Sequence, residues 1–308
     1  MQHFLIDTDT GSDDAVALVM ALRSPNVQVE AITTVAGNVP LEMATQNALY
    51  TVELCGKSTP VYAGIAKPMI RAYVSAQDVH GLDGMGDLGL PLTGRRPAPG
   101  HAVHIIGDLI RRSPGEITLV TLGPLTNIAA ALLIDPSLAY QVKRCVVMGG
   151  ASDGIGNMTP TTEYNIYADP EAARIVFESG MPITMVGWDI ARKYALISEA
   201  EEIALRDLNT PLAAFAVDIN RLVKEFEWRV LKLVGFTLPD PVAMAVALDP
   251  SIITGNFDCY ASVETNEGRC YGQMVLDQIG WTQRPATTTA VTAIARDRFI
   301  DLLRGALR

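Results

Sequence analysis

The feature that most constrains the fold of this chain is an acidic stretch near its start, between two apolar runs. Residues 7–14 read DTDTGSDD, which places four carboxylates within eight positions. The apolar residues 4–6 before it are typical of the end of a buried strand, and the run from Ala15 onward is typical of a helix. Gly11 permits a sharp turn, and Ser12 is a suitable helix N-cap. The acids are therefore expected in a strand-to-helix loop.

Helix capping explains only part of this acidic loop. Asp13 and Asp14 would complement the dipole of the helix, but Asp7 and Asp9 lie before it. Carboxylates held so close together repel one another unless they are protonated or neutralised by a cation. Oxygen ligands suit Ca²⁺ or Mg²⁺, and one loop that offers several carboxylates and leaves room for water and hydroxyl groups suits Ca²⁺ better. The sequence thus predicts a bound Ca²⁺.

The rest of the chain alternates between strand-like and helical runs. The expected strands are 4–6, 27–35, 61–63, 117–122, 144–148 and 183–186, and the expected helices among them are 41–55, 98–112, 125–134 and 170–178. Further on we expect helices over 199–206, 212–233, 241–248 and 296–307 and a β-hairpin formed by 259–265 and 270–276. This order predicts a single α/β domain over 1–308, with a mainly parallel, Rossmann-like central sheet flanked by helices. Gly37-Asn38, Gly123-Pro124 and Gly149-Gly150 each follow a predicted strand, so they are expected to meet the acidic loop at one cleft.

Composition excludes several classes of partner. A net charge of −10 argues against an extended phosphate-binding surface, so no nucleic acid is expected. No apolar run is long enough to span a membrane, and no charged leader precedes an apolar segment. The four cysteines are scattered without metal-binding spacing, which suits reduced thiols. We therefore expect a cytoplasmic protein without a membrane partner.

Four segments resemble, in the same order, the nucleoside hydrolases, the inosine-uridine preferring N-ribohydrolase family. They are DTDTGSDDAVAL from Asp7, GPLTN from Gly123, NMTPTTEYN from Asn157 and DPVA from Asp240. The resemblance implies a nucleoside hydrolase-type catalytic domain that hydrolyses the N-glycosidic bond of ribonucleosides to ribose and free base, for nucleoside salvage. It also implies a homodimer or homotetramer.

The resemblance further implies roles for individual residues. The Ca²⁺ ligands would be Asp9, Asp13, Asp14, Asp240 and the backbone carbonyl of Leu122. Asp9 would also act as the catalytic base that removes a proton from the attacking water. The residues expected around the ribose are Asp13, Asn38, His80, Met148, Asn157, Glu163 and Asn165.

Several of these positions have a simpler interpretation from residue type alone. Asn38 also suits a turn, and Met148 also suits the apolar core. His80 lies in a glycine-rich segment that is typical of a mobile flap, where it equally fits a surface loop. Asp240, between two prolines, also suits a helix N-cap.

The base-binding side is less well defined by the sequence. Many members of the family carry a histidine directly before the aspartate matched by Asp240, and this histidine is associated with protonating the departing base. Here the residue is Pro239, so protonation of the base must differ, and base preference cannot be carried over. The candidate wall for the base is the predicted helix 212–233, with Arg221, Glu225, Trp228 and Arg229, although an ordinary amphipathic helix is an alternative.

Two other functions fit the acidic loop. A phosphatase of the haloacid-dehalogenase type uses a DxD motif after a strand, and Asp7 and Asp9 have that spacing, although a downstream lysine and a further acidic pair would be needed. A non-catalytic, Ca²⁺-dependent nucleoside-binding protein is the second alternative.

Overall fold

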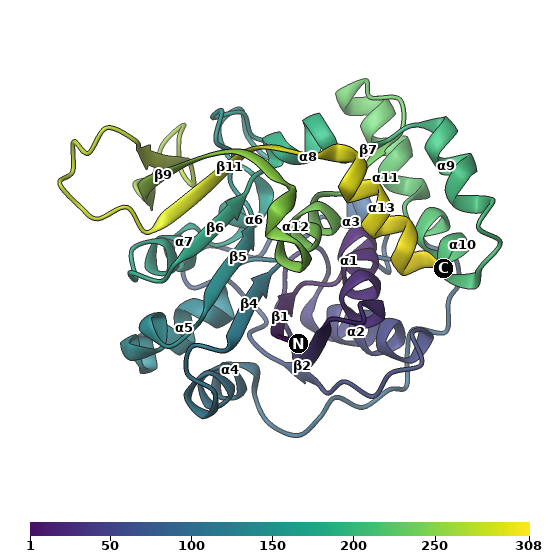
Figure 1. Cartoon of the computed structure of the whole chain (residues 1–308), viewed down its shortest axis with the longest axis horizontal. Coiled ribbons are helices and arrows are strands. Elements are labelled where there is room, and N and C mark those ends of the chain that lie inside the picture. Colours follow the sequence, from purple (N-terminus) through teal and green to yellow (C-terminus); the bar gives the residue numbers. More distant parts are fainter.

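A nine-stranded sheet forms the centre of the computed structural model, which describes residues 1–308 (Figure 1). Its strand order is β10-β9-β11-β6-β5-β4-β1-β2-β3. These strands are β1 (Gln2–Thr8), β2 (Val27–Thr34), β3 (Val61–Ala63), β4 (Ile117–Thr121), β5 (Arg144–Met148), β6 (Ile183–Val186), β9 (Ile253–Val263), β10 (Met274–Asp277) and β11 (Thr288–Ile294). From β3 to β11 neighbouring strands pair in parallel, whereas β9 is antiparallel to both β10 and β11. The predicted α/β fold with a mainly parallel sheet is confirmed.

The sheet reverses its winding direction at the centre. From β1 the chain proceeds outward through β2 and β3, and it then returns to β4 on the other side of β1. In such sheets the loops after the two central strands diverge and leave a crevice at the carboxyl edge. The acidic loop follows β1, so it lies at this crevice.

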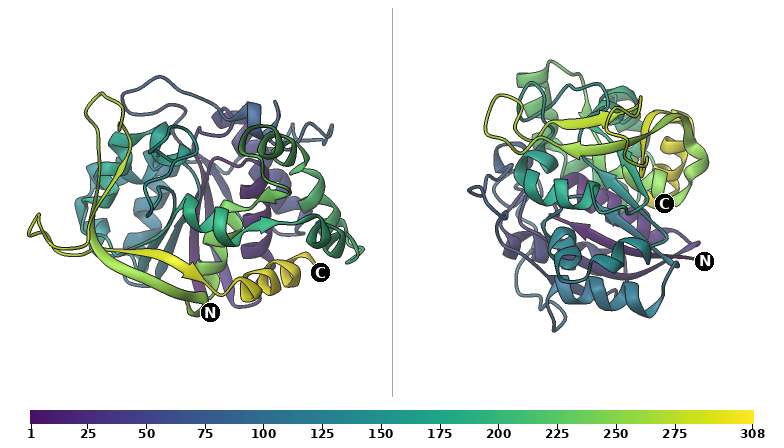
Figure 2. Two further views of the ribbon diagram at one scale, coloured as in Figure 1. Left: turned by 90° about the horizontal axis from the view of Figure 1, so that it is seen from above. Right: turned by 90° about the vertical axis from the view of Figure 1, so that its left-hand side faces the viewer.

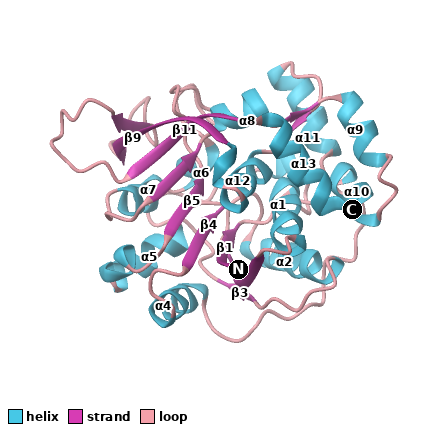
Figure 3. Ribbon diagram, viewed as in Figure 1, coloured by secondary structure: helices cyan, strands magenta, loops and turns pink.

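Helices cover both faces of the sheet (Figure 3). The main helices are α1 (Ser12–Arg23), α2 (Leu41–Leu54), α3 (Gln77–His80), α4 (Ala102–Arg112), α5 (Thr126–Ile134), α6 (Tyr164–Ala168), α7 (Pro170–Phe177), α8 (Trp188–Tyr194), α9 (Glu199–Arg206), α10 (Pro211–Asp218), α11 (Arg221–Phe226), α12 (Pro239–Leu248) and α13 (Arg296–Leu307). Three short turns, η1 (Pro136–Tyr140), η2 (Glu227–Leu231) and η3 (Pro250–Ile252), and a two-stranded sheet of β7 (Leu196–Ile197) and β8 (Phe236–Thr237) complete the chain. No helix has both the length and the apolar character needed to cross a membrane.

Alternate residues of the central strands enter two separate apolar cores. In β1, Phe4 and Ile6 belong to a core shared with α1, α12 and α13, whereas Leu5 belongs to a core shared with α4, α5 and α7. Successive side chains of a strand point to opposite faces of the sheet, so both faces of β1 must be apolar. This explains why the run before the acidic loop is apolar throughout and does not alternate with polar residues.

Helix α1 is the most enclosed helix of the fold. All its residues from Ser12 to Leu22 are buried, and it packs against α2, α10, α12 and α13. The first turn of α1 carries Asp13 and Asp14, so the packing around this helix fixes the position of the acidic loop.

Two elements differ from their predicted form. The expected long helix 212–233 is divided into α10, α11 and the π-helical turn η2, with a break after Asp218. The expected hairpin exists as β9 and β10, but its β9 strand begins at Ile253, and strand β11 was not predicted. Figure 2 shows the end of this hairpin and the loop after β10 projecting from one end of the molecule.

Candidate active site

A cavity of about 500 Å³ opens at the carboxyl ends of the parallel strands. Its wall draws on segments that follow or end β1, β2, β4, β5 and β6, and on the chain from α3 and from α11 to α12. The residues that line it are Asp13, Asn38, Val74, Ser75, Ala76, Asp78, Val79, His80, Leu122, Met148, Asn157, Met158, Glu163, Tyr164, Asn165, Trp188, Val223, Phe226, Glu227, Leu231, Thr237, Pro239 and Asp240. The segments after the parallel strands therefore converge as predicted.

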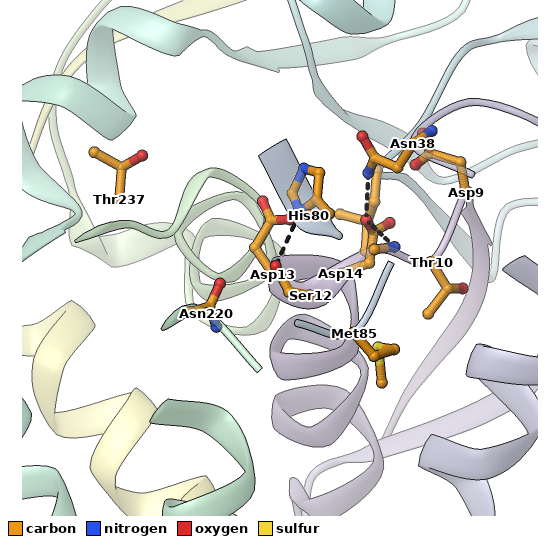
Figure 4. A network of polar contacts seen from close by, with 12 residues as sticks. Asp9, Thr10, Ser12, Asp13, Asp14, Asn38, His80, Met85, Asn220 and Thr237 are labelled. Atoms are coloured by element: carbon orange, nitrogen blue, oxygen red, sulfur yellow. Dashed lines mark hydrogen bonds and ion pairs between the residues drawn. The ribbon is translucent and has the colours of Figure 1, made fainter. Parts of the chain in front are cut away.

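Three predicted metal ligands form one buried cluster. Oxygen atoms of Asp13, Asp14 and Asp240 all lie within 4.8 Å of one another. The Asp14 carboxylate accepts hydrogen bonds from the Gly11 N–H (2.9 Å) and the Asn38 side-chain amide (3.0 Å). Asp13 and Asp240 line the cavity, whereas Asp14 lies outside its lining. Figure 4 shows Asp13 and Asp14 at the start of α1, with Asn38 hydrogen-bonded to Asp14.

Asp9 lies in a narrow slot between two backbone segments. Its Oδ2 accepts the Asn38 N–H at 2.6 Å, and its buried Oδ1 has no hydrogen-bond partner. A Cβ atom added to Gly37 would lie 2.0 Å from Oδ2, and one added to Gly123 would lie 2.6 Å from Oδ1. These glycines therefore allow the loops after β2 and β4 to approach the carboxylate. Asp9 is fully buried and is not among the cavity-lining residues.

The electrostatics of this acidic group fit a divalent cation. Burial raises the pKa of Asp13 to about 6, and it also raises the pKa values of Asp9, Asp14 and Asp240. The charges of neighbouring aspartates raise the pKa values of Asp9, Asp14 and Asp240 further. No lysine or arginine pairs with any of the four, and Asp13 Oδ1, like Asp9 Oδ1, has no hydrogen-bond partner. Buried oxygen atoms without partners are suitable ligands for a hard cation such as Ca²⁺ or Mg²⁺.

The residues predicted around the ribose lie beside this acidic group. Glu163 accepts N–H groups of Gly150 (2.9 Å) and Asn165 (2.8 Å), which fixes its carboxylate at the cavity wall. The Asn165 amide donates to the carbonyl of Leu122 at 2.7 Å and contacts Met148. Asn157 lies in an exposed part of the wall, where its side chain accepts the Tyr164 N–H.

His80 is placed differently from the surface loop considered for it. It ends the short helix α3, is buried, and its Nδ1 hydrogen-bonds the Ser12 hydroxyl at 2.8 Å (Figure 4). Burial lowers the pKa of His80 to about 4, so the ring is neutral near pH 7. The N-cap of α1 is Gly11, which leaves the Ser12 side chain free for this contact.

The predicted base wall is formed by the correct helix but by its other face. Arg221, Glu225, Trp228 and Arg229 are exposed and do not line the cavity. Arg221 donates to the carbonyl of Gly86 instead. The cavity is lined by Val223, Phe226, Glu227 and Leu231. Glu227, four positions after the apolar Val223, was missed because the predicted wall followed another face of the same segment.

Asp7 does not fit the nucleophile of a phosphatase. It is fully buried outside the cavity lining, and its carboxylate accepts hydrogen bonds from Thr33 and Asn127. It also lies outside the acidic cluster of Asp13, Asp14 and Asp240, so the structure gives no support to the phosphatase interpretation of the DxD motif.

Comparison with known proteins gives a consistent result. The model of the inosine-uridine preferring nucleoside hydrolase family matches residues 4–301. The chain is 36% identical to the pyrimidine-specific ribonucleoside hydrolase RihA of Photobacterium profundum, over 97% of this chain and 96% of that protein. It is 39% identical to an uncharacterized protein of Schizosaccharomyces pombe, over 97% and 96% of the two chains. The structure is similar to that of a purine-preferring ribonucleoside hydrolase from Gardnerella vaginalis, with a TM-score of 0.92, 32% identity and coverage of 99% and 98%.

Proposed function

Because the chain belongs to the family of inosine-uridine preferring nucleoside hydrolases, it is an N-glycosyl hydrolase, and we propose that it hydrolyses ribonucleosides to ribose and free base in a Ca²⁺-dependent reaction. One observation carries the proposal. A buried cluster of aspartates reaches the cavity at the carboxyl edge of the sheet through Asp13, which has an unpartnered oxygen, and through Asp240, and hydrogen-bonding groups suited to a sugar line the same cavity. The proposed biological role is nucleoside salvage.

The cation would be held by Asp9, Asp13, Asp14, Asp240 and the Leu122 carbonyl. A bound divalent cation lowers the pKa of water and attracts sugar hydroxyl groups. The carbonyl of Leu122 already accepts from Asn165, and its oxygen has a second lone pair available. The clustering of Asp13, Asp14 and Asp240 supports this assignment.

The chain's own residues then bind and activate the substrate. Asn38, Asn157, Glu163 and Asn165 offer donors and acceptors for the ribose hydroxyls, with Met148 and His80 beside them. Asp9 accepts a proton from the water that attacks the anomeric carbon, and the Asn38 N–H orients its carboxylate for this role. The transition state resembles an oxocarbenium ion, as in other glycosyl hydrolyses.

The choice of base does not follow from similarity alone. One relative is named for pyrimidine nucleosides and another for purine nucleosides, at comparable identity. We therefore propose a ribonucleoside as the substrate. Selectivity between bases would depend on the base half of the cavity, which we define as the part lined by Val223, Phe226, Glu227, Leu231 and Thr237.

We also propose a cytoplasmic location and a homodimeric or homotetrameric assembly. All four cysteines are free thiols, and three of them are buried, which suits a reducing compartment. Ile279 and Trp281, in the projecting loop after β10, are exposed apolar side chains of the kind that assembly would cover. Measuring the molar mass in solution by light scattering tests the assembly.

A panel of common nucleosides, assayed for release of reducing sugar, tests the reaction. We expect turnover with Ca²⁺, loss of turnover after exhaustive chelation, and recovery when Ca²⁺ is restored. The melting temperature should also fall on chelation, since a ligand at about 100 times its Kd stabilises the native state by about 2.7 kcal/mol. Turnover by a verified metal-free protein would refute the cation requirement, and riboside binding without turnover would favour the non-catalytic alternative.

A further inference from the structure

One carboxyl group lies on the side of the cavity that α11, η2 and β8 form. Glu227 is 3% exposed and lines the cavity, on a wall that is otherwise largely apolar. Its neighbours along the chain on this wall are Val223, Phe226 and Leu231. No lysine, arginine or histidine forms an ion pair with it. A buried carboxylate without a cation is costly, so its presence requires an explanation.

Glu227 is held in a defined orientation by Thr237. Its Oε2 accepts the Thr237 N–H at 2.9 Å, and its Oε1 accepts the Thr237 hydroxyl. Each carboxyl oxygen keeps a further lone pair, and either can carry a proton. Since Thr237 also lines the cavity, the anchored carboxyl group is presented to a molecule bound there. Figure 4 shows Thr237 well separated from Asn38, with Asp13 between them in the view.

This environment favours the protonated form. Burial raises the pKa of Glu227 to about 7, the two hydrogen bonds from Thr237 oppose the increase, and the charge of Asp13 adds to it. A carboxyl group that titrates near neutral pH is well suited to proton transfer.

We propose that Glu227 is the general acid that protonates the departing base. This inference rests on the proposed function. The glycosidic C–N bond breaks and its electron pair passes to the base, while the carboxyl proton of Glu227 moves to a ring nitrogen, so that the base leaves uncharged. Water forms the new C–O bond at the anomeric carbon and gives its proton to Asp9. Exchange with solvent returns a proton to Glu227 and removes one from Asp9, so the net reaction adds one water.

The other groups on this side of the cavity are less suitable acids. Pro239 has no ionisable side chain. His80, on α3, lies against the acidic cluster, with its Nδ1 hydrogen-bonded to Ser12 and 3.7 Å from Asp13 Oδ1. Asp78, also on α3, is exposed at the edge of the cavity. Asp13, on α1, belongs to the acidic cluster.

The test compares Glu227→Gln with Glu225→Gln, which makes the same change on the exposed side of the same segment. Each is assayed with Ca²⁺ on nucleosides and on p-nitrophenyl riboside, whose leaving group needs no proton. For Glu227→Gln we expect kcat on nucleosides to fall by about 10²-fold or more, with hydrolysis of p-nitrophenyl riboside retained. We expect wild-type turnover of nucleosides to decline above about pH 7, where Glu227 loses its proton. This decline should be absent in Glu227→Gln. Glu225→Gln should behave as the wild type.

If Glu227→Gln still hydrolyses p-nitrophenyl riboside, the variant is folded and Asp9 still activates the attacking water. Parallel loss of both activities would mean that Glu227 only anchors Thr237, and equal nucleoside activity in wild type and Glu227→Gln would also overturn the proposal. A wild-type protein that cleaves neither class of riboside would refute the proposed function itself, and the acid assignment with it. Thr237→Val, which removes one anchor but keeps the carboxyl group, should reduce nucleoside turnover less than Glu227→Gln does.

Discussion

The acidic half of the cavity and its base half are built in different ways. The acidic half consists of loops that follow neighbouring parallel strands, and backbone N–H groups hold its carboxylates at Asp9, Asp14 and Glu163. The base half consists of α11, η2 and the segment through β8, where apolar side chains surround one carboxyl group. The acidic half therefore holds carboxylate oxygens in fixed positions, whereas the base half mainly provides apolar surface.

The two halves of the cavity should therefore differ in how well they tolerate substitutions. A Cβ atom added to Gly37 or to Gly123 would lie within 3 Å of the Asp9 carboxylate, so two backbone segments enclose this side chain closely. On the base side, Phe226 is only half-buried and Leu231 is 37% exposed. Substitutions in the acidic half should therefore reduce kcat, and substitutions of the apolar base wall should mainly change KM and the choice of base.

The largest effect in this comparison is expected at Asp9. Asp9→Asn keeps the size of the side chain but removes the proposed catalytic base, so kcat should fall about 10²–10⁴-fold. Riboside binding, measured by calorimetry, should remain detectable because the ribose contacts are unchanged. A variant with nearly normal kcat would remove Asp9 from the mechanism and erase the distinction between the two halves.

A smaller but still large effect is expected at Gly123. In Gly123→Ala the new Cβ atom would lie 2.6 Å from Asp9 Oδ1, so the carboxylate or the loop must move. A displacement of about 1 Å can reduce the rate about 10²-fold. The matched control is Gly268→Ala in the hairpin loop, where no atom lies within 4 Å of the added carbon. Equal kcat for the two variants would show that the slot around Asp9 is not needed.

The smallest effect is expected on the apolar wall. Phe226→Ala removes part of the surface that faces the base, so KM for nucleosides should rise by roughly tenfold, equivalent to about 1.4 kcal/mol. Inhibition by free ribose should be unchanged. Trp228 is two residues further on but outside the cavity, so Trp228→Ala should change neither KM for nucleosides nor inhibition by ribose. If Trp228→Ala raised KM and Phe226→Ala did not, the base would contact the face of the helix that the sequence suggested.

The difference between the two halves also explains why the sequence predicts one of them better than the other. The acidic half is encoded in short segments directly after buried strands, so strand position was enough to group the acidic loop with Gly37-Asn38, Gly123-Pro124 and Gly149-Gly150 at one edge. The roles of single residues there, such as Leu122, came from the family resemblance. The predicted base wall followed the face of Trp228, whereas the cavity is lined by Glu227 and the residues on its face. Both faces belong to the same segment of α11 and η2, and no local pattern in the sequence indicates which of them turns toward the cavity.

The position of helix α1 has a consequence for how the chain is made. This helix is synthesised early, but it is covered by α12 and α13, which come from the end of the chain. Contacts between distant parts of a sequence slow folding, and a chain emerging from the ribosome folds from its N-terminal side first. We therefore expect the first turn of α1 to be enclosed only after α12 and α13 have been synthesised. The like charges of the acidic loop should then be buried late in folding, when these two helices pack against α1.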